Sequence, residues 1–259
     1  MPMFNKYEPL PEGELKTSIY DLAGQLKFPL KNLYVVDGSK RSSHSNAYLY
    51  GMGKNKRIGR CTPRKRCLLA LSLVSSRTLV CVVSLPSSFF FTVLYDTLLG
   101  QVDRDEILAI LGHELGHWKL GHVVTNFVVT QLYSFAAFYS FSLCYQNDAL
   151  YRAFGFDDPS RPVPTIIALL LFFETLWAPV DKVLSVLVTA NSRRCEFEAD
   201  QFSFGLGMGK KLQTALCKIS VENLGPMNPD PWYSTYHYSH PPLGERLGAL
   251  MKQDKKKRE

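Results

Sequence analysis

The sequence predicts a mainly α-helical, multi-pass membrane protein with a small β element. Two long apolar stretches, residues 123–145 and 163–189, are the first observation behind this prediction. The second is a helix pattern just before them that carries two histidines one turn apart. The third is a pair of short, alternating segments near the N-terminus that predict strands. We expect one domain over residues 1–259.

The composition limits the classes of partner. The chain has 259 residues, a net charge of +7 and a mean hydropathy of −0.06. Its basic excess is concentrated in residues 54–66 and 255–258, which lack interleaved aromatic residues, so nucleic acid is not an expected partner. Beside apolar segments, such runs predict cytosolic flanks that face anionic lipid. The six cysteines show no C-x-x-C spacing, which favours a reducing compartment.

The N-terminal third predicts one helix and two strands. Residues 4–28 carry apolar side chains at helical spacing, and Pro29 ends that pattern. Residues 33–36 and 46–50 predict the strands. A strong helix pattern begins at Asp103, which can form a capping box with Glu106. Its predicted buried side consists of Ile107, Leu108, Ile110, Leu111, Leu115 and Trp118.

The two apolar stretches predict a transmembrane hairpin. Residues 123–145 are 23 residues without a formal charge, long enough to cross a hydrocarbon core of about 30 Å. Residues 163–189 are a second candidate span, although Glu174 and Asp181 interrupt it and should face a bundle interior or a watery cavity. A polar loop, residues 146–162, joins the two stretches. Two buried helices of a large soluble core are the alternative.

Residues 113–117 read His-Glu-Leu-Gly-His, the H-E-x-x-H pattern. The i, i+4 spacing places the imidazoles of His113 and His117 on one helix face, where they can share one Zn²⁺. Glu114 is placed to act as the catalytic proton acceptor for a water molecule. His122 lies about 140° further round a continuous helix, so we expect a helix-end or interfacial histidine there.

A catalytic zinc site needs a third protein ligand. No third histidine follows at the spacing of H-E-x-x-H-x-x-G-x-x-H, so acids on a later helix are the candidates. Glu196 and Asp200 share one helix face, and one can bind zinc while the other orients a histidine. We expect Glu198, which lies between them in the sequence, to be a solvent-exposed acid. Two membrane crossings would return Glu196 to the side of the histidines, and flanking basic residues place that side in the cytosol.

With these residues in view, the chain resembles the integral-membrane CaaX prenyl proteases, the type I zinc endoproteases of the endoplasmic reticulum. The stretches that carry the resemblance are residues 4–15, 26–50, 93–98, 113–119 (HELGHWK), 193–200 (RRCEFEAD) and 238–247 (YSHPPLGERL).

The resemblance implies roles for individual residues. Glu196 matches the third zinc ligand, and Asp200 matches the acid behind the ligands. Arg246 matches a buried arginine near that acid. His240 matches a histidine that steadies the oxyanion, and Asn46 lies on the edge strand that binds an extended substrate peptide.

The resemblance also implies an activity and a location. The expected function is a zinc metalloendopeptidase that removes the C-terminal tripeptide from isoprenylated CaaX proteins. Its partners would be those substrates and membrane lipid, in the endoplasmic reticulum membrane, with the active site facing the cytosol. Residues 256–259 also fit a dilysine retrieval signal. The alternatives are a membrane quality-control metalloprotease, and an inactive product that only binds partners or zinc.

Two departures from the family pattern stand out. Family members begin with several further transmembrane helices, so the resemblance implies a chain truncated at its N-terminus. Residues 59–92 form a 34-residue insert with no acidic residue and a phenylalanine-rich end. Joining Ile58 to Val93 would restore a continuous strand. We interpret the insert as a retained intron or gene-model error.

Overall fold

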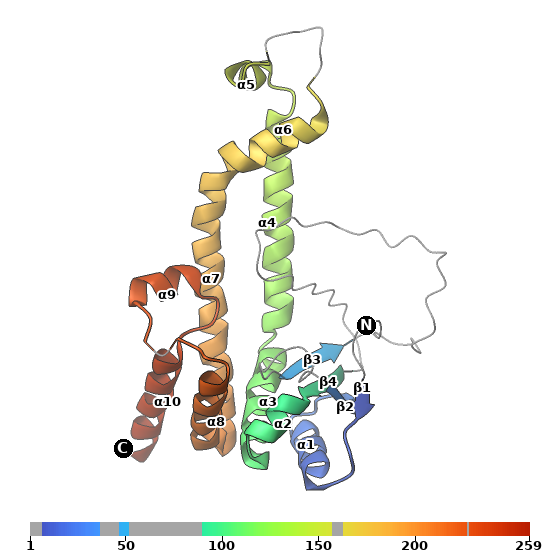
Figure 1. The fold of residues 1–259 in the computed structure, drawn as a ribbon, viewed down its shortest axis with the longest axis vertical. Coiled ribbons are helices and arrows are strands. Elements are labelled where there is room, and N and C mark those ends of the chain that lie inside the picture. Colours follow the sequence, from blue (N-terminus) through green and yellow to red (C-terminus); the bar gives the residue numbers. More distant parts are fainter. Residues whose placement is uncertain (1–6, 37–46, 52–89, 157–162, 227) are drawn as a thin grey trace, which may run out of the picture.

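The computed structural model describes residues 7–36, 47–51, 90–156, 163–226 and 228–259. Within these ranges a four-stranded sheet and a group of helices surround the base of a tall helical hairpin (Figure 1). Asn46, and all of the 59–92 insert except its last three residues, lie outside the described residues. The elements are β1 (Tyr7–Pro9), α1 (Glu14–Gln25), β2 (Leu30–Val36), β3 (Ala47–Gly51), β4 (Phe90–Tyr95), α2 (Asp96–Gln101), α3 (Arg104–Lys119), α4 (His122–Cys144), α5 (Asp148–Ala153), α6 (Thr165–Leu171), the π-helical turn η1 (Phe172–Leu176), α7 (Trp177–Ser203), the kinked turn η2 (Phe204–Met208), α8 (Gly209–Glu222), α9 (Pro231–His237) and α10 (Leu243–Arg258).

The expected β element is present and has the strand order β1-β2-β4-β3. β1 and β2 are antiparallel, β2 and β4 are parallel, and β4 pairs antiparallel with β3. β2 and β3 correspond to the two strands predicted from the sequence. β3 is an edge strand of this sheet and contacts α3, so one sheet edge lies beside the helix that carries the histidines.

The predicted N-terminal helix is α1, and it packs on the sheet and on α3. Its buried residues Ile19, Leu22 and Ala23 share one helix face. They join Leu33 of β2 and Leu111 of α3 in one apolar cluster. This cluster holds one face of α3 against α1 and the sheet, and the histidines project from another face of the same helix.

The start of α3 is capped as the sequence predicts. Glu106 accepts a hydrogen bond of 2.8 Å from the backbone N–H of Asp103. The Glu106 carboxylate also accepts one of 2.7 Å from Lys218 on α8. The predicted apolar side is confirmed: Ile107, Ile110, Leu111 and Leu115 are buried, and Leu108 and Trp118 pack against them. The cap and the packing together fix the rotation of α3 about its axis.

The first apolar stretch forms α4, the one helix among the described residues that is long and apolar enough to cross a membrane. The second stretch differs from the single helix that we expected over 163–189. It divides into α6, η1 and α7, and α7 continues past residue 189 to Ser203. Pro179 explains the division, because its missing N–H cannot bond the carbonyl of Thr175 and the helix widens just before it.

α4 and α7 run side by side (Figure 1). Polar side chains join the two helices. Tyr133 of α4 donates a hydrogen bond to Asp181 of α7, and the indole N–H of Trp177 donates to the same tyrosine hydroxyl at 3.1 Å. Asn191 donates to Asn126 at 3.1 Å, closer to the base. The Asp181 carboxylate thus faces its partner helix, as expected for an acid in this stretch. Glu174 in η1 differs from that expectation, because its side chain is exposed. The expected loop 146–162 contains the short helix α5.

Candidate metal centre

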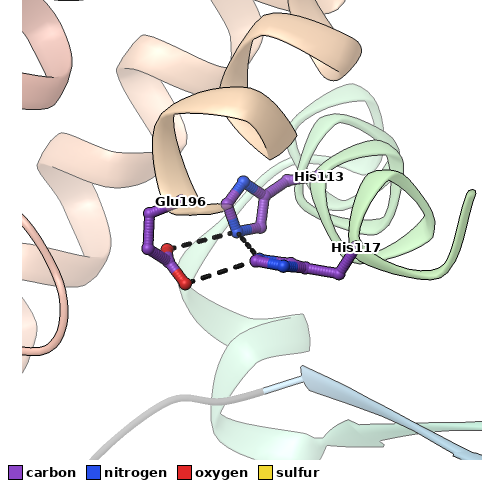
Figure 2. Close-up of side chains that lie close together, drawn as sticks. All are labelled: His113, His117 and Glu196. Atoms are coloured by element: carbon purple, nitrogen blue, oxygen red, sulfur yellow. Dashed lines mark hydrogen bonds and ion pairs between the residues drawn. The ribbon is translucent and has the colours of Figure 1, made fainter. Parts of the chain in front are cut away.

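Three side chains from two helices converge at the base of the hairpin (Figure 2). His113 and His117 lie one turn apart on α3, and their Nε2 atoms are 3.2 Å apart. Glu196 of α7 places Oε2 at 3.5 Å from His113 Nε2 and Oε1 at 3.4 Å from His117 Nε2. The carboxylate thus closes a triangle with the two ring nitrogens.

This triangle matches the requirements of a zinc ion. Zinc binds imidazole nitrogen and carboxylate oxygen at about 2.0–2.2 Å in tetrahedral geometry, which places neighbouring ligand atoms about 3.4 Å apart. The three separations here are 3.2, 3.4 and 3.5 Å. Two nitrogen donors and one oxygen donor are also a common set for a catalytic zinc with one open position. The donors therefore fit this metal in both chemistry and spacing.

Asp200 and Arg246 form the support behind His113. The His113 Nδ1–H donates to Asp200 Oδ1 at 2.9 Å, which leaves Nε2 with its lone pair facing the triangle. Arg246 of α10 grips Asp200 with two hydrogen bonds of 2.8 and 2.5 Å. The structure thus brings Asp200 and Arg246 to the site, where the resemblance had implied them.

His240 reaches the site from the loop before α10. Its Nδ1 donates to Glu196 Oε1 at 3.1 Å, while 69% of the side chain remains exposed. The hydrogen bond to Glu196 raises the pKa of His240. An exposed ring that is anchored at one nitrogen can present its other nitrogen to a bound molecule.

Glu114 follows His113 directly on α3. Burial raises the pKa of its carboxyl, and the nearby imidazoles of His113 and His117 act in the opposite direction, with a net rise. A carboxylate that takes up a proton more readily than usual suits a proton acceptor.

The charges of the triangle are strongly coupled. Burial lowers the pKa of His113, but hydrogen bonds to Asp200 and Glu196 outweigh it and raise this pKa to about 9. Burial raises the pKa of Glu196, but hydrogen bonds from three imidazoles hold it well below its ordinary value. A divalent cation at the triangle would compete with protons for these ligand atoms.

Sequence reasoning missed one contact to the metal centre. His122 Nδ1 lies 3.0 Å from His117 Nδ1, and His122 Nε2 lies 3.0 Å from Glu198 Oε2. The 140° offset assumed a continuous helix, but Gly121 has φ 72° and ψ 19°, in the left-handed region, and separates α3 from α4. The glycine two residues after Lys119 is the signal that could have shown the break.

A second missed contact fixes the last helices. Arg193 of α7 is buried, donates to Glu245 of α10 at 2.6 Å, and donates to the carbonyl of Ser234 in α9 at 3.2 Å. Both charged residues stood in the stretches that carry the resemblance, but their pairing was not predicted. This link holds α10, and with it Arg246, against α7.

The residue expected to bind substrate is not placed by the structure. Asn46 lies outside the described residues, one position before the start of β3 at Ala47. The side chains of β3 are likewise undescribed. What the structure does describe is the backbone of an edge strand near α3.

Comparison with known proteins identifies the family of this chain. The sequence profile of peptidase family M48 matches residues 9–62 and 84–254. Residues 63–83, in the middle of the insert, fall outside that match.

The curated relatives that the chain matches are proteases by name. The chain is 47% identical to a CAAX prenyl protease 1 homolog of Oryza sativa over 257 residues, which is 99% of this chain and 51% of the relative. It is 44% identical to the Homo sapiens homolog, with 97% and 54% covered, and 39% identical to CAAX prenyl protease 1 of Saccharomyces cerevisiae, with 100% and 52% covered. The chain therefore spans about half the length of the curated relatives it matches.

A solved structure shares the fold. The crystal structure of S. mikatae Ste24p superposes with a TM-score of 0.75 at 37% identity, covering 96% of this chain and 52% of that one. The matched region includes both helices that supply the triangle. Helix geometry, ligand spacing and sequence thus point the same way, and this chain belongs to peptidase family M48.

Proposed function

We propose that this chain carries the catalytic half of a zinc metalloendopeptidase that removes the C-terminal tripeptide from isoprenylated CaaX proteins. The observation that carries the proposal is the convergence of His113, His117 and Glu196 at zinc-ligand spacing, with Glu114 beside them. The substrate class comes from the CAAX prenyl protease names of the relatives.

The residues divide the chemistry among them. A zinc ion bound by the triangle supplies Lewis acidity at neutral pH. Glu114 accepts the proton of the attacking water and delivers it to the leaving amine, a role that its raised pKa favours. His240 donates from its exposed ring edge to the carbonyl oxygen as negative charge develops there.

The substrate binds as an extended strand along the edge of the sheet. β3 has β4 on one side only in the described sheet, so its other edge has backbone groups available for pairing. Asn46, just before β3, would fix the peptide backbone with its amide. In this position the scissile bond lies between the sheet edge and the metal centre.

The exposed apolar surface of the hairpin supports a membrane location for this chemistry. Exposed apolar side chains cover α4 and the upper part of α7, including Leu132, Phe135, Leu143, Val183 and Leu187. Such faces suit contact with lipid or with further membrane helices. Basic residues lie close to the site in the chain: Lys119 ends the histidine helix α3, and Arg194 precedes Glu196 on α7. We assign this side to the cytosolic face of the endoplasmic reticulum membrane.

Cleavage of a farnesylated CaaX peptide tests this proposal. We expect the purified chain with zinc to release the C-terminal tripeptide, and Glu114→Gln to lose about 10²–10⁴-fold in rate while its zinc content stays at one per chain. Equal cleavage of the peptide without its lipid would favour a quality-control protease. Zinc binding without any turnover would favour a chain that only binds partners or metal.

A further inference from the structure

The two zinc-binding histidines have different partners behind them. His113 donates directly to a carboxylate, that of Asp200. Behind His117 stands another imidazole, with the two Nδ1 atoms 3.0 Å apart. The far nitrogen of that second ring, His122 Nε2, lies 3.0 Å from Glu198 Oε2. A chain of three groups therefore runs outward from the metal centre.

Proton positions along this chain follow from the donor rules. A carboxylate only accepts, so His122 Nε2 must carry the proton that faces Glu198. Neutral His122 then has a lone pair on Nδ1 and must accept from the Nδ1–H of His117. That tautomer leaves the His117 Nε2 lone pair directed at the triangle, which is the form that binds a metal.

We propose that Glu198 and His122 form a relay that positions His117 and fixes its tautomer for zinc binding. Each zinc-binding imidazole thereby has a carboxylate behind it, Asp200 in direct contact and Glu198 through one intervening ring. The inference rests on the proposed zinc site and adds two positioning residues to it.

The surroundings of the relay support this role. His122 is only 5% exposed although it is the first residue of a helix with a largely exposed surface. Arg194 donates to Glu198 Oε1 at 2.7 Å, whereas His122 contacts the other oxygen, Oε2, so the two contacts are separate. The left-handed Gly121 turns the chain so that His122 faces back toward α3 and α7.

The relay also connects the membrane hairpin to the metal centre. His122 begins α4, whereas Glu198 lies on α7 two residues after the ligand Glu196. A shift of α4 against α7 would change the ring contact to His117. The position of α4 relative to α7 therefore sets the orientation of one zinc ligand, His117.

The competing interpretation is that Glu198 is a surface acid whose partner is Arg194. An exposed pair at i, i+4 contributes little to stability. The two interpretations differ in which partner matters for zinc affinity, so the matched control is Arg194→Gln. It removes the other partner of the same carboxylate and leaves the relay intact.

Zinc affinity, measured by competition with a chelator on the full chain in detergent, tests the relay without relying on cleavage. We expect His122→Phe to weaken zinc binding about 10–100-fold, the range found for groups directly behind metal ligands. Glu198→Gln should weaken it less, about 3–10-fold, because Glu198 acts on His117 only through the ring of His122. His122→Asn keeps an acceptor for the His117 Nδ1–H, so it should recover most of the loss seen with phenylalanine. Arg194→Gln should stay within about twofold of the wild type.

Melting temperatures of the metal-free proteins separate positioning from folding. The relay predicts metal-free melting temperatures close to wild type for Glu198→Gln and His122→Asn, together with weaker zinc binding. Wild-type affinity in Glu198→Gln and His122→Phe would overturn the inference, as would an equal loss in Arg194→Gln. If the wild-type chain itself binds no zinc, the proposed function fails first, which distinguishes the two failures.

Discussion

Glu196 is the residue that completes the proposed metal centre with the two histidines. It lies on a different helix from His113 and His117, yet its oxygens lie 3.5 and 3.4 Å from their Nε2 atoms. It is 5% exposed and accepts hydrogen bonds from surrounding imidazoles. A substitution of this buried carboxylate should therefore weaken metal binding more than it weakens folding.

We predict that Glu196→Gln weakens zinc binding by more than about 100-fold, above the 10–100-fold seen when only a group behind a ligand is changed. The amide removes the negative ligand and leaves two imidazoles and water. Metal content after dialysis against a weak chelator is the measurement. Glu222→Gln, an exposed glutamate on α8, is the control and should retain zinc. Full zinc retention by Glu196→Gln would place the third ligand elsewhere.

At the scale of elements, the site depends on the close contact of α3 and α7. A Cβ added at Gly116 would lie 3.2 Å from the backbone Cα of Ala199 and 3.1 Å from the Cβ of Phe202. Ser203 at the end of α7 donates to the Ala109 carbonyl at 2.9 Å and fixes the same contact. Glycine at 116 therefore sets the helix separation that lets Glu196 reach the histidines.

We predict that Gly116→Ala destabilises the protein by about 1–3 kcal/mol, because backbone and not a flexible side chain must give way. Zinc affinity should fall with it, since the helices move apart. Gly24→Ala in α1 has nothing within 4 Å of its new Cβ and should be neutral or stabilising by up to about 1 kcal/mol. Thermal unfolding of both variants checks this. A Gly116→Ala protein as stable as the Gly24→Ala protein would contradict it.

The contact between α3 and α8 should depend on pH. Burial raises the pKa of Glu106, but hydrogen bonds from Lys218 and from the Asp103 backbone outweigh it and lower this pKa below its ordinary value of 4.5. A lowered native pKa means that the ionised form stabilises the fold above pH 4.5, and that this stability is lost as pH falls through the native pKa.

We predict that Glu106→Gln melts at a lower temperature than wild type at pH 7, and that the gap narrows as the pH falls below about 4.5. Melting curves from pH 7 to pH 3 measure it. Glu12→Gln, at the surface beside Lys16, serves as the control and should leave the profile unchanged. A gap that is constant with pH would show that the carboxylate charge is not the cause.

For the whole molecule, the open question is the insert at 59–92. Its last three residues, Phe90 to Thr92, pair with β3 in the first half of β4. By the same register, removal of the insert would bring Lys56 to Ile58 into these positions. Residues 52–55 would then form a four-residue hairpin loop, a length common between antiparallel strands. We therefore propose that the sheet does not need the insert.

We predict that a chain lacking residues 59–92 binds zinc at least as tightly as the full chain and cleaves the farnesylated peptide faster. The reason is that a shorter loop between β3 and β4 costs less conformational entropy to close. A deletion of residues 59–89, which keeps Phe90 to Thr92, is the comparison. Better performance by that shorter deletion would show that these three residues belong to the strand. Sequencing transcripts across the junction tests the origin of the insert.

Much of this site could be predicted from local spacing. His113 and His117 at i, i+4, and Glu196 and Asp200 at i, i+4, share helix faces whatever the tertiary fold, because 3.6 residues make a turn. The capping box at Asp103 and Glu106 is likewise a short-range pattern. The second apolar stretch was harder, because hydropathy does not show how a proline divides a helix.

By itself, the sequence determined the two helix faces that form the candidate metal centre, the apolar length of α4 and the β element, since each depends on residues close together in the chain. Only the tertiary structure decided which acid meets which histidine. The left-handed Gly121 turns the chain between α3 and α4, and Glu198 then faces His122. The small Gly116 lets α7 approach α3 closely, and Asp200 then faces His113. These pairings join residues far apart in sequence, and helical periodicity carries no information about the distance between two helices.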